Sequence, residues 1–266
     1  MSRAQFKELI VQSKIKGIID KISDASVIEK DILRTFFPAH FTKSGDQMSR
    51  FQEDQIKYLR TMTKNVLYAA SEYSEMTGYL QGVNSIAASL CYHYLGSMIS
   101  MRERQNGDSE LIFMKLEYDE YELFCMFINL TVDSGYASTV YNLTTFKEST
   151  DKLSLELLEN NPEFQEYGVR KSEMASLLTS IIIPNIVTFF MRGSSQINSK
   201  RLLFLLSSMQ FMVAAKQLTR IFFDGLKSDM LECEDWMEAL HCLRSADLDL
   251  YLTKTGFWKK INCNVF

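Results

Sequence analysis

Apolar residues recur every three or four positions along most of this 266-residue chain, which is the period of an α-helix with one buried face. The first such run extends from about residue 4 to residue 36. Phe37-Pro38 should end it, because the residue before a proline is pushed out of the helical conformation. The same pattern predicts amphipathic helices at about residues 56–70 and 83–94, and it resumes at Tyr121 and continues to the end of the chain.

Interruptions of this pattern are short. They are the polar stretch Thr42–Gln47, the hydrophilic stretch Arg102–Glu110, Asn160–Pro162 and Gly193–Ser195. Apolar and polar residues alternate nowhere over a sustained length, as a half-buried strand would require. Three prolines and eleven glycines are few for this length, which favours long helices over many turns. The sequence therefore predicts an all-α fold.

Two later stretches are almost wholly apolar, residues 177–191 and 202–215. The first contains Pro184 and ends at Arg192, and the second has about fourteen residues, which is too short to cross a bilayer comfortably. We interpret both as buried core helices.

The composition is that of a globular protein, with 46% hydrophobic and 23% charged residues. A net charge of −4 gives no support for nucleic-acid binding or for a polybasic membrane anchor. The five cysteines and three histidines form no local zinc pattern, so we expect buried, reduced thiols in a cytosolic protein. Acidic clusters at 117–120 and 232–235 are interpreted as solvated faces and helix N-terminal charges.

Two short motifs carry the candidate chemistry. An arginine, Arg34, ends the first, and a glutamine, Gln81, lies in the second between Gly78 and Gly82. Arginine can neutralise a transferring phosphoryl group, and a glutamine amide can hold an attacking water. From the residues alone, a surface ion pair with Asp31, three positions earlier on a helix, is the favoured explanation of Arg34. The glycines likewise fit either a close backbone approach or a simple corner between two helices.

No competing active site is found in the sequence. A P-loop of the form G-x-x-x-x-G-K-[ST] is absent, and so is a G-x-S-x-G nucleophile elbow. The chain is therefore not expected to bind nucleotide through a P-loop of its own.

The segment Ile28–Leu90 resembles the first half of a TBC domain, the GTPase-activating domain for Rab-family small GTPases. The residues that match its I-x-x-D-x-x-R motif and the following threonine–aromatic–proline stretch are Ile28, Asp31, Arg34 and Thr35–Pro38. The residues that match its G-Y-x-Q-G-M-N motif are Gly78, Tyr79, Gln81, Gly82 and Asn84, with Val83 in place of methionine. Residues 58–71 are similar to the helix that the family places between the two motifs.

The second half of the chain is less similar to the family. Tyr121–Phe124 looks like the helix after the family's variable insert, and Arg220–Leu226 looks like its R-I-W-D segment, with Phe223 where tryptophan is usual. An R-x-W motif has no counterpart before Ile28. The resemblance implies a divergent two-lobed helical domain over residues 1–266, with lobes at about 20–118 and 119–266.

The resemblance also implies a mechanism with two catalytic residues. Arg34 would neutralise charge on the phosphates of the GTPase-bound GTP, and Gln81 would position the attacking water. Asp31 and Tyr79 would orient these two side chains. Residues assigned to the GTPase interface are Thr35, Gly82 and Asn84. GTP and Mg²⁺ would belong to the GTPase, so no cofactor or metal ion of the chain's own is expected.

The implied partner is a Rab-family GTPase in its GTP form, in the regulation of vesicle trafficking. The chain would be cytoplasmic and would reach endomembranes only indirectly, through the GTPase. Two alternatives stay open. One is a catalytically silent TBC-like module that binds a Rab or scaffolds a complex, and the other is a helical adaptor unrelated to GTPases. The missing R-x-W motif and Phe223 favour the silent module, whereas the presence of both Arg34 and Gln81 favours catalysis.

Overall fold

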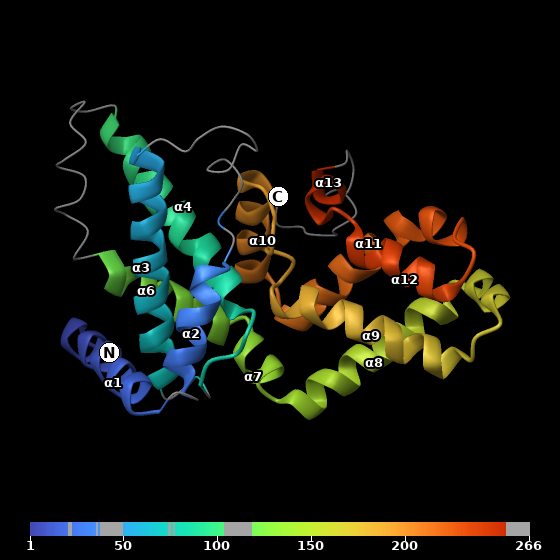
Figure 1. Cartoon of the computed structure of the whole chain (residues 1–266), viewed down its shortest axis with the longest axis horizontal. Coiled ribbons are helices and arrows are strands. Elements are labelled where there is room, and N and C mark those ends of the chain that lie inside the picture. The colour runs from blue at the N-terminus through green and yellow to red at the C-terminus, as the bar shows by residue number, and fades with distance from the viewer. Residues whose placement is uncertain are drawn as a thin grey trace.

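In the computed structural model, every regular element of the described residues is a helix, which confirms the all-α prediction (Figure 1). The described residues are 1–20, 23–35, 37, 50–73, 76, 78–103 and 119–253. Phe36, Pro38, the predicted loop Thr42–Gln47 and most of the stretch Arg102–Glu110 lie outside them. In chain order, the helices are α1 (Arg3–Ile19), α2 (Asp24–Leu33), α3 (Arg50–Glu72), α4 (Val83–Glu103), α6 (Asp119–Val132), α7 (Tyr136–Val140), α8 (Leu143–Glu159), the 3₁₀ helix η3 (Pro162–Tyr167), α9 (Lys171–Val187), α10 (Gln196–Ser208), α11 (Phe211–Leu231), α12 (Trp236–Ser245) and α13 (Leu248–Thr253).

The N-terminal group of helices is built around α3, which packs against α1, α2, α4 and α6. The apolar side of α3 supplies Leu59, Met62 and Val66, all of which are fully buried. The buried apolar side chains of α2 include Ile28 and Ile32, one helical turn apart. This packing fixes the C-terminal end of α2, where Arg34 lies, against the body of the group.

The C-terminal group consists of α8, α9, α11, α12 and η3, and it extends away from the N-terminal group in Figure 1. Its centre is aromatic. The ring centroid of Phe164 lies 5.5 Å from that of Phe223 and 5.6 Å from that of Trp236, with edge-to-face geometry in both pairs. The phenylalanine at position 223 is thus a buried core residue.

One hydrophobic core runs through both groups of helices. Helix α10 packs against α4 and α11, and α7 packs against α6, α8 and α11, so these two helices join the groups. The predicted division near residue 119 stays a prediction, and α6, which begins there, packs against α3 and α4.

The prediction of one continuous helical run over residues 4–36 is wrong, because the structure has two helices there. Helix α1 ends at Ile19 and α2 begins at Asp24. The helices approach closely at Gly17, where an added Cβ atom would lie 2.8 Å from Cβ of Ala25. Since each helix buries residues at a 3.6-residue period, the apolar pattern continues across the break and hides it. The helices predicted at 56–70 and 83–94 are confirmed as α3 and α4.

The apolar stretches also have different outcomes. Residues 177–187 belong to α9, with Pro184 inside the helix, and the chain turns before Arg192. The prediction of one helix over residues 202–215 is wrong, because Met209 is extended and Gln210 is not helical, and the two residues separate α10 from α11. In the part of the chain that the structure describes, no helix is long and apolar enough to cross a membrane.

Candidate functional site

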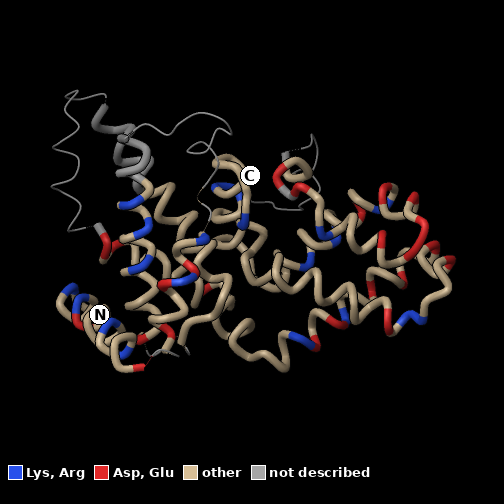
Figure 2. The backbone as a smooth tube through the Cα atoms, in the orientation of Figure 1, with Lys and Arg blue, Asp and Glu red and all other residues tan. Residues whose placement is uncertain are grey.

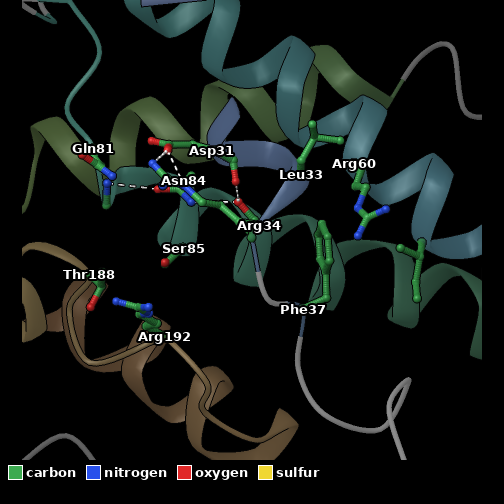
Figure 3. Close-up of a pocket in the computed structure, with 13 residues that line it drawn as sticks. Asp31, Leu33, Arg34, Phe37, Arg60, Gln81, Asn84, Ser85, Thr188 and Arg192 are labelled. Atoms are coloured by element: carbon green, nitrogen blue, oxygen red, sulfur yellow. Dashed lines mark hydrogen bonds and ion pairs between the residues drawn. The ribbon is translucent and has the colours of Figure 1, made fainter. Parts of the chain in front are cut away.

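A groove with a volume of about 570 Å³ lies between the C-terminal end of α2, α3, the start of α4 and the turn after α9 (Figure 3). It contains every site residue that the sequence predicts except Tyr79. These residues are Asp31, Arg34, Thr35, Gln81, Gly82 and Asn84. The fold therefore brings the two motifs together at one surface, although their roles stay predictions.

Arg34 caps the C-terminal end of α2, and its side chain is held at one edge by Asp31. Nε of Arg34 donates to Oδ1 of Asp31 over 3.0 Å, and Nη2 of the same guanidinium donates to the same oxygen. Asp31 is 1% exposed, whereas the Arg34 side chain is 64% exposed. The pair therefore orients the guanidinium and leaves much of it open to the groove, a geometry that suits a phosphate contact.

Tyr79 reaches the same carboxylate from the second motif. Its hydroxyl group donates to Oδ2 of Asp31 over 2.8 Å, and its backbone N–H donates to Oδ2 of Asp24 over 2.8 Å. Burial, followed by the hydrogen bond to Asp31, raises the pKa of Tyr79 well above its usual value. Tyr79 therefore stays protonated and remains a hydrogen-bond donor at neutral pH.

A second link between the motifs runs through Thr35 and Asn84. Thr35 Oγ1 donates to the carbonyl oxygen of Asp31 over 2.7 Å and accepts from Nδ2 of Asn84 over 2.8 Å. Oδ1 of Asn84 accepts from the backbone N–H of Gly82 over 3.0 Å. Thr35 and Asn84 are both buried. Their polar atoms thus fix the turn that carries Gln81 relative to the end of α2.

The two glycines around Gln81 adopt a conformation that other residues avoid. Gly78 has φ 102° and Gly82 has φ 114°. A Cβ atom on Gly82 would lie 2.5 Å from Cγ1 of Val187, at the end of α9. Gln81 itself is exposed in the turn and lines the groove. Both interpretations of these glycines hold, because they lie in the corner between α3 and α4 and Gly82 also approaches Val187 closely.

The C-terminal half of the chain supports the same turn. The hydroxyl group of Tyr141 donates to the carbonyl oxygen of Gly78 over 2.8 Å, and that of Tyr136 donates to the carbonyl oxygen of Val187 over 2.9 Å. Burial raises the pKa of both tyrosines above the usual value. Residues from both groups of helices therefore determine where Gln81 lies.

Several groove residues were not anticipated from the sequence. Arg60 comes from α3, Ser85 from the first turn of α4, and Thr188 and Arg192 from the turn after α9. Three arginines line the groove, and Asp31 is the one acidic side chain among its described lining residues. Figure 2 shows that acidic residues gather instead at the far end of the C-terminal group. No local motif marks Arg60 or Arg192, because only the packing of distant helices brings them here.

The described ranges contain no group of three or more His, Cys, Asp or Glu side chains placed to hold a metal ion. Cys91, Cys125, Cys233 and Cys242 are free thiols, and burial raises the pKa of Cys91 to about 12. Cys263 and His40 lie outside the described residues. Of the acidic clusters, Asp235 caps the N-terminus of α12, as predicted, whereas residues 117 and 118 lie outside the described residues.

A family model described as the Rab-GTPase-TBC domain matches residues 5–221 of the chain. No curated protein matches the chain. The matched region contains the whole groove and Tyr79, and the segment Arg220–Leu226 runs past its end. The proposed likeness of that segment to R-I-W-D stays a prediction.

Proposed function

The chain belongs to the Rab-GTPase-TBC family, and from this premise we propose that it accelerates GTP hydrolysis on a Rab-family small GTPase through Arg34 and Gln81. The observation that carries the proposal is that both side chains line one groove, while Asp31 joins their motifs through hydrogen bonds to Arg34 and Tyr79. Such preorganisation lowers the cost of assembling a catalytic geometry when the partner binds.

Arg34 supplies the positive charge in this proposal. As GTP is cleaved, negative charge spreads over the phosphate oxygens, and a guanidinium delivered by a second protein stabilises it. Asp31 occupies one edge of the Arg34 fork, so the exposed edge can face these oxygens. An arginine in this role accelerates hydrolysis by roughly 10³–10⁵-fold.

Gln81 holds the attacking water in this proposal. Its amide can donate to and accept from a water molecule in line with the bond that breaks. The turn that carries it is held by Gly78, Gly82 and Asn84, so the backbone does not have to rearrange when the GTPase docks. GTP and Mg²⁺ come with the GTPase. The protein would act on vesicle trafficking at endomembranes, which it would reach through the GTPase.

The test is single-turnover hydrolysis by a panel of GTP-loaded Rab GTPases. Wild-type protein is compared with Arg34→Ala, Arg34→Lys and Gln81→Ala, and with Arg170→Ala as a control outside the groove. We expect strong acceleration of at least one GTPase, lost with both Arg34 variants because an ammonium group cannot replace the planar fork. Full activity of the Arg34 and Gln81 variants would overturn the proposed roles.

A second candidate function is a catalytically silent module that binds a Rab. It rests on the missing R-x-W motif and on the departure at Phe223, although the fold uses Phe223 as a buried core residue outside the groove. The same panel separates the two functions, because a silent module would bind GTP-loaded GTPases without accelerating hydrolysis.

A further inference from the structure

The turn after α9 holds a strained backbone beside the groove. Phe189 has φ 46° and Phe190 has φ 58°, values that residues with a side chain rarely adopt. Both rings are buried, and the backbone N–H of Phe190 donates to the carbonyl oxygen of Asn185 over 2.7 Å. The core thus enforces a conformation that is unfavourable by itself. Strain of this kind gathers at functional sites.

This turn supplies the wall of the groove that faces α2. Thr188 and Arg192 come from it, opposite Arg34 in Figure 3. Hydroxyl Oγ1 of Thr188 bonds to the carbonyl oxygen of Pro184 over 3.0 Å. Arg192 is exposed. The strained turn therefore presents an arginine from the C-terminal half to the same space that Arg34 enters from the N-terminal half.

The charge of the groove is unbalanced. Arg34, Arg60 and Arg192 line it, and the carboxylate of Asp31 already accepts hydrogen bonds from Arg34 and Tyr79. Within the described part of the chain, Arg192 forms no ion pair. A cluster of one sign of charge in a hollow surface attracts a partner of the opposite sign.

A second hollow, of about 640 Å³, lies on the other side of Arg192, between α9 and the α12–α13 segment. Arg192 lines both hollows and so stands on the ridge between them. A nucleotide at Arg34 and Gln81 would fill only the first hollow. A protein surface that delivers this nucleotide is broad enough to cover the ridge as well.

We propose that Arg192 binds a carboxylate group on the surface of the GTPase and thereby helps to select it. This inference rests on the proposed function of the groove. Arg192 is a docking residue and does not act on the reacting phosphate, which is assigned to Arg34. Loss of a charge at the edge of an interface mainly slows association. The expected signature is a raised KM with an unchanged kcat, and a weaker dependence of KM on salt.

The experiment measures kcat and KM for the GTPase that responds best to the wild-type protein. The variants are Arg192→Ala and Arg192→Glu. The matched controls are Arg170→Ala and Arg170→Glu, because Arg170 lies at the opposite end of α9 with a side chain that is 86% exposed. We expect KM to rise about tenfold for Arg192→Ala and further for Arg192→Glu. The value of kcat should stay within about twofold, and the controls should match wild type.

Charge reversal on the partner identifies the carboxylate. Exposed Asp and Glu residues of the responding GTPase are changed singly to Lys, and one of these variants should be rescued by Arg192→Glu. A loss of kcat with unchanged KM would show that Arg192 acts on phosphate and would overturn the inference. Unchanged kinetics for both Arg192 variants would overturn it too.

Failure of the proposed function is distinguishable from failure of this inference. If the wild-type protein accelerates no GTPase, the catalytic proposal fails, and binding to the GTP-loaded panel is measured instead. Weaker binding by Arg192→Glu than by Arg170→Glu would still support the docking role. Equal binding by the two variants, or no binding by the wild-type protein, would overturn it.

Discussion

The hydroxyl group of Tyr79 donates a hydrogen bond to Oδ2 of Asp31 over 2.8 Å, while Oδ1 of the same carboxylate accepts from Arg34. Tyr79 lies two positions before Gln81, and Asp31 lies three positions before Arg34. One buried carboxylate therefore couples the two motifs, although they are far apart in sequence. The orientation of Arg34 and the position of the turn around Gln81 are set by the same group.

Tyr79→Phe should separate this coupling from simple packing, because it removes only the hydroxyl group. Oδ2 of Asp31 would lose its donor, and we expect the free energy of unfolding to fall by about 1–2 kcal/mol. We also expect GTP hydrolysis on the responding Rab to slow by about tenfold, since Arg34 loses part of its support. Urea unfolding and single-turnover hydrolysis measure the two effects.

Tyr251→Phe is the matched control for that variant. Tyr251 also donates its hydroxyl hydrogen bond to a carboxylate, Oδ2 of Asp229, over 2.8 Å, but it lies outside the groove. The Tyr251→Phe variant should leave the rate of GTP hydrolysis unchanged. If Tyr79→Phe lost stability without any change in rate, the bond would be structural only.

Asp31→Asn should impair catalysis while keeping the shape of the side chain. The amide has one oxygen and one donor group, so it cannot accept from both Tyr79 and Arg34 as the carboxylate does. With its oxygen toward Arg34, the amide can still donate from Nδ2 to the hydroxyl oxygen of Tyr79, but it loses the negative charge that pairs with the guanidinium. We expect the single-turnover rate to fall by about 10–100-fold, with Asp31→Ala at least as severe. A rate within twofold of wild type for both variants would contradict the orienting role of Asp31.

The sequence was sufficient to predict the helical class, and the resemblance of its two motifs to a TBC domain pointed to six of the residues that line the groove. Helical periodicity is local and reports burial directly, so α3 and α4 were predicted near their observed positions. The breaks between α1 and α2 and at Met209–Gln210 were missed, because neither interrupts the apolar pattern with proline or with a run of turn residues.

The groove wall formed by Thr188 and Arg192 could not be predicted from the sequence, for a different reason. It depends on the end of α9 meeting the turn at Gly82, a contact between residues more than a hundred positions apart. Phe189 and Phe190 carry no sign of their left-handed backbone, since positive φ is expected at glycine or asparagine. Only tertiary packing produces that conformation.

Gly82→Ala should be strongly destabilising. The new Cβ atom would require φ 114° at an L-residue and would lie 2.5 Å from Cγ1 of Val187. We expect a loss of about 2–4 kcal/mol in the free energy of unfolding, together with slower hydrolysis because Gln81 shifts. Unfolding in urea and single-turnover kinetics test both parts.

Gly168→Ala gives the cost of a positive φ at a position where an added Cβ atom meets no neighbour. Gly168 has φ 69°, and a Cβ atom there would meet nothing within 4 Å. Gly168→Ala should lower the free energy of unfolding by only about 1 kcal/mol and leave the rate of GTP hydrolysis unchanged. The double variant Gly82→Ala with Val187→Ala should lose less stability than the sum of the losses of the two single variants, because the smaller residue 187 removes part of the steric clash. Equal destabilisation by Gly82→Ala and Gly168→Ala would show that contact with Val187 is unimportant.

The stability of the protein should fall steeply at alkaline pH. Burial raises the pKa of Tyr79, Tyr136 and Tyr141 above the ordinary value of 10.0, and it raises that of Cys91 from 9.0 to about 12. The unfolded chain therefore releases protons that the folded chain retains. The resulting stabilisation is nearly complete below about pH 8.5 and is lost as the pH rises through and beyond the unfolded values, by up to about 1.4 kcal/mol per pH unit for each group.

Urea unfolding between pH 7.5 and 11, extrapolated to zero urea, measures this loss. The free energy of unfolding should be nearly constant to about pH 8.5 and should then decline with increasing slope as the cysteine and then the tyrosines titrate in the unfolded state. Tyr141→Phe removes one titrating group, so its stability should decline less steeply above pH 10 than that of the wild-type protein. A free energy of unfolding that stayed flat to pH 11 would contradict the burial of these hydroxyl groups in the folded chain.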